Sequence, residues 1–143
     1  SGIEKPRVAV AGLNPHAGDG GSFGMEEIDV IEPAVKAAQE RGYDVEGPFP
    51  ADTVFLRALK DEFHAVLTMY HDQGQIAMKM MGFDKGVTMM GGLPFPLCTP
   101  AHGTAYDIAG KGIADLGATR EAFRLAVRMA NQRRTGTAAP AAA

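Results

Sequence analysis

Three of the four histidines follow short apolar runs that have the character of buried strands. His16 follows VAVAG, His71 follows AVLTM, and His102 follows VTMMGG after a proline-rich stretch. In α/β proteins, ligands bind in the crevice beyond the carboxyl ends of the strands, so side chains in these loops are expected to face a crevice. Three histidines in such positions predict an active site.

His16 and His71 have the side chains and the neighbours of metal ligands. Glycines near each of them allow the backbone to approach a ligand closely, and Asp72 directly follows His71. Neutral imidazoles with carboxylate neighbours typically bind Zn, Mn, Co or Fe. Two protein ligands are too few for a tight site, so a third would have to come from elsewhere. The alternative is two unrelated surface or helix-capping histidines.

Two aspartates and a lysine near these loops could take part in the chemistry. Asp72 could orient a metal ligand or act as a general acid or base, and Asp52 lies in another loop that follows a predicted strand. Each aspartate could instead cap the helix that follows it. Lys79 could bind a carboxylate or phosphate of the substrate in a partly buried setting among methionines, or it could be an exposed helical lysine.

Apolar strand-like runs alternate with helical patterns along the chain, and these elements must position the loops. Buried strands are expected at residues 7–11, 43–46, 65–69 and 87–90. Helices are expected at residues 26–41, 73–81 and 118–133, with a break or kink at Pro33. A further helix is expected to follow a cap at Asp52 or Thr53 and to run to about Lys60. This alternation predicts an α/β fold with an open, mostly parallel sheet and helices on both faces.

Composition limits the class of protein. The 143 residues carry a formal net charge of −3, with 45% hydrophobic and 22% charged residues, which suits a globular core and leaves no basic footprint for nucleic acid. Cys98 is the single cysteine, which excludes a disulfide within the chain. No apolar run approaches the roughly 18 residues of a membrane span. We therefore expect a cytoplasmic protein that binds neither nucleic acid nor membrane.

The two ends differ from the rest of the sequence. Residues 1–6 are expected to be a tag remnant or linker, because Ser1 and Gly2 resemble a pair left by tag removal. Residues 135–143 (TGTAAPAAA) are of low complexity and are expected to be disordered. Residues 7–134 then form the ordered portion.

The most specific segment is AHGTAYDIAGKGIAD, residues 101–115. It resembles the loop of the isopropylmalate and isocitrate dehydrogenases that wraps the adenosine half of a dinucleotide. The resemblance implies NAD contacts from six residues: His102, Gly103, Thr104, Ala105, Asp107 and Ile108. A carboxylate at Asp107 favours NAD over NADP, because it accepts hydrogen bonds from the ribose 2′-hydroxyl and repels a 2′-phosphate.

Further segments, among them LNPHAGDGG, GPFPADTVF and MYHDQGQIAMK, occur together in one order. From about Val8 to Met129 they resemble the PdxA family, whose namesake is 4-hydroxythreonine-4-phosphate dehydrogenase. The resemblance implies a two-domain, homodimeric enzyme with the isocitrate and isopropylmalate dehydrogenase fold, of which this chain is the C-terminal portion. It also implies a divalent metal, Zn, Mn, Co or Mg, held by three histidines. His16 and His71 match two of them, and the third belongs to the preceding part of a longer chain.

The chain departs from the family at substrate-binding positions. Family members commonly use Lys, Asn and Arg, spaced nine residues apart; Lys79 matches, whereas Thr88 and Leu97 occupy the other two positions. The aspartate that precedes the cofactor-loop histidine in the family is Ala101 here. Replacing a bidentate arginine by leucine removes a strong contact for an anion, which argues against a phosphorylated substrate.

These features imply NAD-dependent, metal-assisted oxidation and decarboxylation of a small hydroxy acid, such as 4-phosphooxy-L-threonine in pyridoxal phosphate biosynthesis. Asp72 or Asp52 would remove the hydroxyl proton, and Lys79 would bind the substrate anion or assist proton transfer. One alternative is a paralogue that acts on a non-phosphorylated hydroxy acid or a cis-dihydrodiol carboxylate. Another is a non-catalytic dinucleotide-binding half-protein. By itself, the chain is expected to bind metal weakly and to catalyse poorly or not at all.

Overall fold

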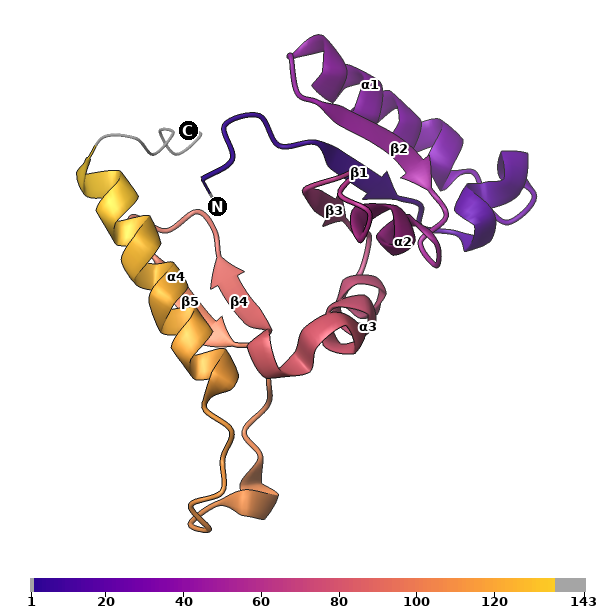
Figure 1. Cartoon of the computed structure of the whole chain (residues 1–143). Helices are drawn as coiled ribbons and strands as arrows, with labels where there is room; N and C mark the ends of the chain where they lie inside the picture. Colours follow the sequence, from indigo (N-terminus) through magenta and orange to yellow (C-terminus); the bar gives the residue numbers. More distant parts are fainter. Residues whose placement is uncertain (1, 136–143) are drawn as a thin grey trace. The chain divides into compact units, whose positions relative to one another are not determined.

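The computed structural model of the chain describes residues 2–135 (Figure 1). These residues form two compact units, which we call the N-terminal unit (residues 3–77) and the C-terminal unit (residues 2 and 78–135). Helix α3 (His71–Gly82) runs across the division between them. Both predicted metal ligands belong to the N-terminal unit, and the predicted cofactor loop belongs to the C-terminal unit.

The N-terminal unit contains a parallel sheet of β1 (Val8–Ala11), β2 (Val45–Phe49) and β3 (Ala65–Leu67), in the order β2-β1-β3. β1 is central and pairs in parallel with both neighbours. Parallel strands need crossover connections, and these contain α1 (Glu32–Glu40) and α2 (Val54–Ala58). The expectation of an α/β fold with an open parallel sheet is confirmed.

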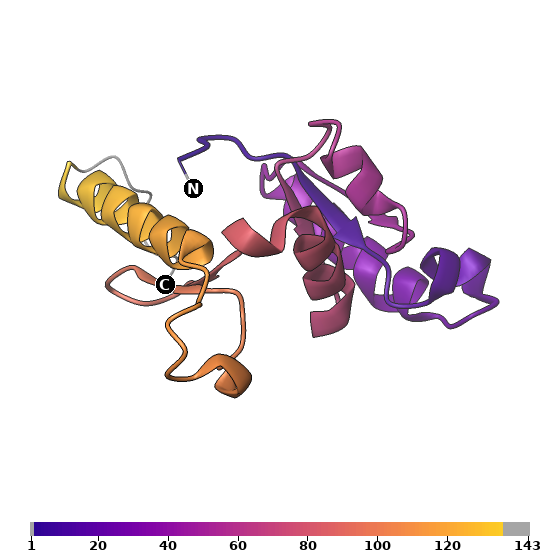
Figure 2. The same ribbon diagram turned by 60° about the horizontal axis from the view of Figure 1, so that its bottom comes forward.

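Both faces of β1 are buried, because alternate residues of a strand point to opposite sides of the sheet. One face packs against α2 through a cluster of four buried residues: Ala9, Ala11, Val54 and Phe63. The opposite face packs on the α1 side through a second buried cluster: Val10, Ile31 and Val35. Helices therefore flank the sheet on both sides, as the continuous apolar run of β1 predicts (Figures 1 and 2).

The helix expected at residues 26–41 has no break at Pro33. It begins as a π-helical turn, η2 (Glu27–Ile31), and continues directly as α1. Pro33 lies in the first turn of α1, where proline is tolerated because a backbone N–H there has no partner within that helix. The turn of η2 matters for the site, because it carries a buried glutamate.

Neither Asp52 nor Asp72 is the N-cap residue of its helix. The N-cap of α2 is Thr53, which forms no capping hydrogen bond with its side chain. α3 begins at His71, two residues earlier than expected, so Asp72 lies inside the first turn. The alternative that these two carboxylates are N-cap residues is therefore wrong.

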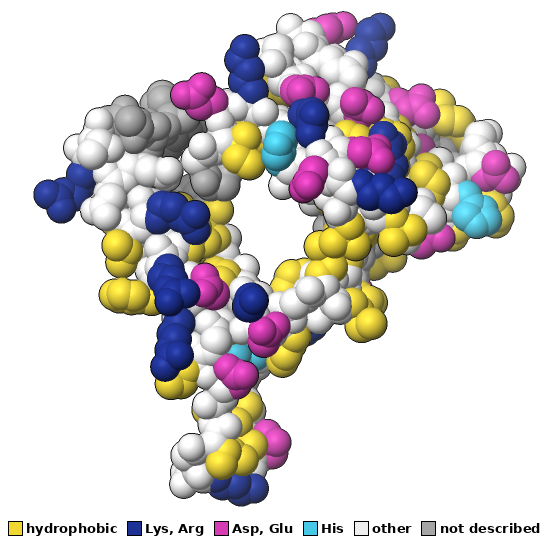
Figure 3. All heavy atoms as spheres, in the orientation of Figure 1, with side chains coloured by type: hydrophobic (Ala, Val, Ile, Leu, Met, Phe, Trp, Pro, Cys, Tyr) yellow, Lys and Arg dark blue, Asp and Glu magenta, His cyan; other side chains and the backbone are white. Residues whose placement is uncertain are grey.

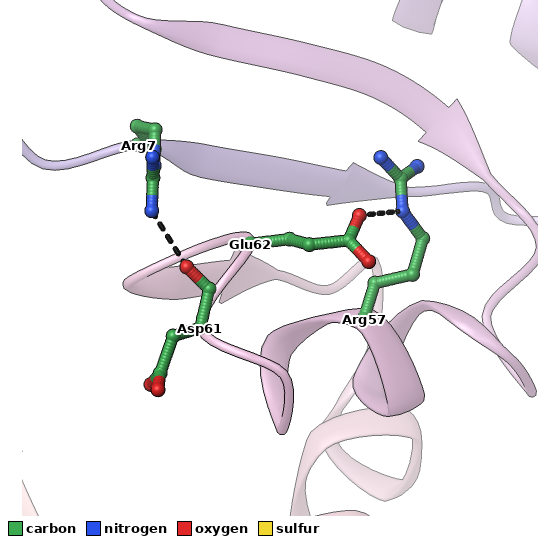
Figure 4. Close-up of polar contacts among 4 residues, drawn as sticks. All are labelled: Arg7, Arg57, Asp61 and Glu62. Atoms are coloured by element: carbon green, nitrogen blue, oxygen red, sulfur yellow. Dashed lines mark hydrogen bonds and ion pairs between the residues drawn. The ribbon is translucent and has the colours of Figure 1, made fainter.

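Arg57 of α2 contacts two aromatic side chains and a carboxylate at the edge of the core. Its guanidinium lies 4.4 Å from the ring centre of Phe49 and 4.8 Å from that of Phe63, and its Nε is 2.7 Å from Oε2 of Glu62. Figure 4 shows this ion pair, together with the hydrogen bond of 2.6 Å that Arg7 donates to the carbonyl of Asp61. These contacts fix the turn that leads into β3.

The C-terminal unit contains an antiparallel pair, β4 (Val87–Met90) and β5 (Leu97–Pro100), against which α4 (Gly117–Arg134) packs. β4 was expected as a strand of the parallel sheet, and β5 was not expected. Six residues join the two strands, which is too short for a parallel crossover and therefore makes them a hairpin. Arginine side chains gather along α4 (Figure 3).

Two expectations concern the ends of the chain and the membrane. Ser1 and residues 136–143 lie outside the described residues, so the predicted tag remnant and disordered tail are described only at residues 2–6 and Thr135. Thr135 is the C-cap residue of α4. Within residues 2–135, no helix is both long enough and apolar enough to cross a membrane.

Candidate active site

A pocket of about 550 Å³ opens in the N-terminal unit, beside the loops that follow the parallel strands. Asn14 and His16 line it from the loop after β1, Asp52 from the loop after β2, and Tyr70 and Asp72 from the segment after β3. This is where α/β sheets bind ligands, and the volume lies in the range of small-molecule sites. The structure therefore brings together three predicted site residues, His16, Asp52 and Asp72, from the three segments that follow the parallel strands.

The rest of the pocket wall is largely apolar. Side chains from the loop after β1, from α2 and from α3 contribute to it: Leu13, Phe55, Leu56, Ile76 and Ala77. An apolar wall with a few convergent polar groups is typical of sites that bind small organic molecules. The sequence did not single out these residues, because apolar side chains at helical spacing are also typical of a core.

His71 is paired with Asp72 next to this pocket. Its Nδ1 lies 2.7 Å from Oδ1 of Asp72, and its side chain is 74% exposed. A carboxylate accepts hydrogen bonds, so Nδ1 carries a proton, and in the neutral imidazole Nε2 then presents a free lone pair. Metal-binding histidines usually donate their second N–H to a carboxylate or carbonyl in this way. His71 itself does not line the pocket, whereas its partner Asp72 does.

His16 lies in a backbone segment of unusual conformation. Residues 16–20 all have positive φ, including the non-glycine residues His16 (54°), Ala17 (54°) and Asp19 (45°). Left-handed backbone costs roughly 1–2 kcal/mol for each residue with a Cβ, and such strain is concentrated at functional sites. The ring of Phe23 packs edge-on against His16, with the two ring centres 5.7 Å apart.

Glu27 is a buried carboxylate behind the His16 loop, and its burial was not predicted from the sequence. Only 1% of its surface is exposed. Its Oε1 accepts hydrogen bonds from the backbone N–H groups of Leu13 and Asn14, each at 2.7 Å. Its Oε2 accepts a third, of 2.9 Å, from Nδ2 of Asn14. Burial acts to raise the pKa of Glu27, but these hydrogen bonds outweigh it and lower the pKa below its ordinary value.

Glu27 should make the stability of the protein depend on acid pH. Because its pKa is lower in the folded than in the unfolded protein, its stabilising contribution is present above the unfolded pKa and is lost as the pH falls through the folded pKa. Glu27→Gln should therefore reduce the loss of stability below about pH 4. Urea denaturation at about pH 7 and about pH 3 measures this. Glu26→Gln, at an exposed position, should show the same pH dependence of the free energy of unfolding as wild type. An unchanged pH dependence in Glu27→Gln would contradict the role given to the Glu27 carboxylate.

Gln73 ties the His16 loop to the segment that carries His71. Its Nε2 donates a hydrogen bond of 2.9 Å to the carbonyl of Gly12, and its Oε1 accepts one of 2.9 Å from the N–H of Met69. One amide side chain thus holds the ends of β1 and of the β3 segment together. This link was also missed, because a glutamine in a helix gives no sequence signal of a long-range partner.

The described donor set is suited to a divalent metal but is incomplete. Two imidazoles with a neighbouring carboxylate match the preferences of Zn or Mn. Over residues 2–135, however, no three His, Cys, Asp or Glu side chains are grouped so that they could hold a metal ion. His16 and His71 therefore supply part of a ligand set at most.

Three predicted substrate-binding residues lie in the C-terminal unit. Thr88 of β4 pairs with Thr99, and Met90 pairs with Leu97 of β5, so Thr88 and Leu97 lie on the same face of the hairpin. Lys79 is exposed, which corrects the expectation of a partly buried setting. The reason is that α3 buries none of its residues in the described structure, so its methionines do not enclose the lysine.

The predicted cofactor loop joins β5 to α4 and is largely exposed. It contains one short helix, η4 (Tyr106–Ile108), and extends away from the hairpin and α4 (Figure 1). Nδ1 of His102 lies 2.9 Å from the carbonyl of Gly103, so Nδ1 donates and Nε2 remains an acceptor. A Cβ added to Gly103 would have no heavy atom within 4 Å, so packing within the chain does not require glycine there.

Comparisons with known proteins agree with this arrangement. The family model described as "Pyridoxal phosphate biosynthetic protein PdxA" matches residues 1–126. A Rhizobium meliloti protein, provisionally named a 4-hydroxythreonine-4-phosphate dehydrogenase, is 78% identical over 139 residues, which are 97% of this chain and 40% of that protein. The 4-hydroxythreonine-4-phosphate dehydrogenase of Beijerinckia indica is 56% identical over 128 residues, 90% of this chain and 38% of its own length.

Solved structures that match this chain are also dehydrogenases. The crystal structure of 4-hydroxythreonine-4-phosphate dehydrogenase from Klebsiella pneumoniae matches with a TM-score of 0.78 and 46% identity, over 90% of this chain and 39% of that one. A terephthalate 1,2-cis-dihydrodiol dehydrogenase from Burkholderia xenovorans matches with a TM-score of 0.55 and 35% identity, over 87% and 40% of the two chains. The chain spans about 40% of the length of these relatives. By its motifs, its fold and the family match over residues 1–126, the chain belongs to the PdxA family.

Proposed function

We propose that the protein containing this chain is a dehydrogenase that oxidises the CH–OH group of a small hydroxy acid with NAD and a divalent metal, followed by loss of CO₂. One observation carries the proposal: His16, Asp52 and Asp72 converge on one pocket at the carboxyl ends of the parallel strands. The names of the relatives support oxidation of 4-hydroxythreonine-4-phosphate. Because the chain spans about 40% of their length, the activity of the whole protein is part of the proposal.

His16 and His71 would hold the metal, Zn, Mn, Co or Mg. When bound, such an ion polarises the substrate hydroxyl and stabilises the negative charge that develops on oxygen. The Asp72 carboxylate, 2.7 Å from Nδ1 of His71, would keep that imidazole in the tautomer whose Nε2 is a ligand. Metal binding thus gives Asp72 a role in orienting His71.

Asp52 is the better candidate for the base that removes the hydroxyl proton. It lines the pocket and forms no hydrogen bond with another of the described residues, whereas Oδ1 of Asp72 is occupied by His71. Oxidation removes a proton from the hydroxyl group and a hydride from its carbon, with NAD accepting the hydride. Asp52 would take the proton directly or through a water. Lys79 would bind an anionic group of the substrate or assist proton transfer.

The loop at residues 101–115 would bind NAD. Nε2 of His102 is an acceptor suited to the amino group of adenine, and the exposed carboxylate of Asp107 is suited to the ribose hydroxyls. The remaining contacts would come from the residues around them: Gly103, Thr104, Ala105 and Ile108.

Gly103→Ala should weaken NAD binding without harming the fold. The added methyl group meets open space within the chain, so an increase in the KM for NAD of about tenfold would report a close approach of the dinucleotide. Gly91→Ala is a matched control, because Gly91 also has no heavy atom within 4 Å of an added Cβ. Steady-state kinetics with varied NAD measures both variants. An equal KM for NAD in wild type and Gly103→Ala would contradict a role of this loop in NAD binding.

Leu97 favours a second candidate substrate class. It occupies the position at which family members commonly carry an arginine, and Thr88 on the same face of the hairpin replaces an asparagine. A leucine cannot bind a phosphate through its side chain. The similarity to a terephthalate cis-dihydrodiol dehydrogenase makes a dihydrodiol carboxylate the specific alternative.

A substrate screen tests the proposal and separates the two classes. The full-length protein is mixed with NAD, a divalent metal and either 4-phosphooxy-L-threonine or a cis-dihydrodiol carboxylate, and NADH formation is followed. NADH from the phosphorylated acid alone supports the first class, and NADH from the dihydrodiol alone supports the second. No metal-dependent NADH from either compound, or from a panel of other hydroxy acids, would contradict the proposed function.

A further inference from the structure

The side chain of Glu27 lies at the centre of the loop that carries His16. The loop follows β1, and Glu27 reaches it from η2, more than ten residues further along the chain. Three hydrogen bonds join the carboxylate to the start of the loop: two from the backbone N–H groups of Leu13 and Asn14, and one from the Asn14 side chain. Hydrogen bonds to a charged acceptor contribute more than those between neutral groups.

The loop also closes around this carboxylate sterically. A Cβ at Gly12 would lie 3.0 Å from Oε1 of Glu27, and a Cβ at Gly18 would lie 2.6 Å from Oε2. Gly18 also has a φ of +82°, which favours glycine independently. The loop therefore has glycine at two points where its backbone touches the buried glutamate. Packing, and not chain flexibility alone, explains these two glycines.

The bonds to Leu13 and Asn14 end just before the strained part of the loop. Asn14 has an extended backbone, and the left-handed stretch begins at His16, two residues later. Glu27 fixes the backbone position of Leu13 and Asn14, which lie just before this stretch. It therefore also fixes the position of the backbone that leads into His16. A conformation that costs free energy at three non-glycine residues persists only if its surroundings hold it.

The charge on Glu27 has no counter-ion from a side chain. Among residues 2–135, Glu27 forms no ion pair, and its partners at hydrogen-bonding distance are neutral N–H groups. A buried charge without a cation is expensive unless hydrogen bonds compensate it. A purely architectural role could be filled at lower cost by a neutral side chain, so the charged acceptor points to a requirement for strong bonds at this loop.

We infer that Glu27 is a positioning residue for His16: its carboxylate holds the loop backbone in the conformation that presents the imidazole to the pocket. The effect of Glu27 on metal binding rests on the proposed function, in which His16 is a ligand. Its effect on the loop conformation does not depend on the proposed function. Glu27 contacts neither substrate nor metal in this assignment and acts through Leu13 and Asn14.

The test compares two adjacent glutamates in the full-length protein. Glu27→Gln keeps one oxygen acceptor but replaces the other by an NH₂ group that faces Nδ2 of Asn14, another donor. Glu26→Gln is the matched control, because exposed Glu26 contacts Nδ2 of Asn14 and its replacement can still accept that bond. Amide hydrogen exchange of residues 13–20 without metal, the dissociation constant for Mn²⁺ and the KM for NAD are measured for each protein.

Glu27→Gln should speed exchange at Leu13 and Asn14 and raise the Mn²⁺ dissociation constant by about 10- to 100-fold, as loss of an orienting partner does. Excess Mn²⁺ should restore kcat, and the KM for NAD should not change. A role in overall stability alone would instead raise exchange throughout the protein and lower the apparent kcat in proportion to the folded fraction. If Glu27→Gln does not fold, Asn14→Ala, which removes the side-chain bonds to Glu26 and Glu27 but leaves both backbone N–H bonds to Glu27, should show a smaller effect in the same direction.

Three results would overturn the inference. They are unchanged exchange at residues 13–20 in Glu27→Gln, equal Mn²⁺ dissociation constants in wild type and Glu27→Gln, and equal effects of the Glu26 and Glu27 substitutions. Failure of wild type to bind Mn²⁺ would count against the proposed function instead, and local exchange would still decide whether Glu27 holds the loop.

Discussion

His71→Ala in the full-length protein is expected to lower kcat/KM by about 10³-fold, which corresponds to roughly 4 kcal/mol of lost transition-state stabilisation. The reason is that the exposed Nε2 of His71 is the proposed ligand, while Nδ1 is already engaged by Asp72. The side chain is 74% exposed, so its removal should not disturb the core. Steady-state kinetics at saturating metal, together with thermal unfolding, measures activity and stability separately.

His64 provides the control for this substitution. It belongs to the same unit, and its Nδ1 accepts a hydrogen bond of 2.9 Å from the backbone N–H of Arg7, away from the pocket lining. His64→Asn retains an acceptor there and should keep nearly wild-type activity. A His71→Ala variant that is as active as His64→Asn would show that His71 is not a metal ligand.

Asp72→Asn is expected to lower metal affinity by about 10- to 100-fold, the effect usual for removing a carboxylate that orients a metal-binding histidine. The amide oxygen can still accept a hydrogen bond from the N–H at Nδ1 of His71, so the geometry is kept. The imidazole, however, no longer has a negatively charged neighbour, which would make its Nε2 a better ligand. Titration of the variant with Mn²⁺, followed by activity, measures the change.

Asp29→Asn is a suitable comparison for Asp72→Asn. Asp29 is an exposed carboxylate of η2 in the same unit and does not line the pocket. Its substitution should leave metal affinity unchanged. Were Asp72→Asn to lose activity at every metal concentration, with no change in affinity, Asp72 would act on the substrate directly and not through His71.

The sequence was informative where short-range patterns decide the structure. The apolar run at Val8–Ala11 predicts a strand buried on both sides, and this strand is the centre of the parallel sheet. The strands of a parallel sheet end on the same side, so the segments that follow them and carry His16, Asp52 and Asp72 could be expected to meet there. The pocket confirms that these three residues meet, whereas their chemical roles stay predictions.

Contacts between distant residues were not predictable. Glu27 is the second residue of a run of charged and apolar side chains that predicts an ordinary helix face, and nothing local indicates that its carboxylate is buried. Its burial depends on a loop more than ten residues away. The exposure of Lys79 was missed for a related reason, because helical spacing of methionines predicts burial only if another element covers that face.

Calorimetric titration of the metal-free full-length protein with Mn²⁺ shows whether His16 and His71 belong to one divalent metal site. We expect one ion bound per subunit in wild type, with the dissociation constant raised by about 100-fold or more in both His16→Ala and His71→Ala. Equal stoichiometry and affinity in wild type and either variant, with all three proteins folded, would contradict it.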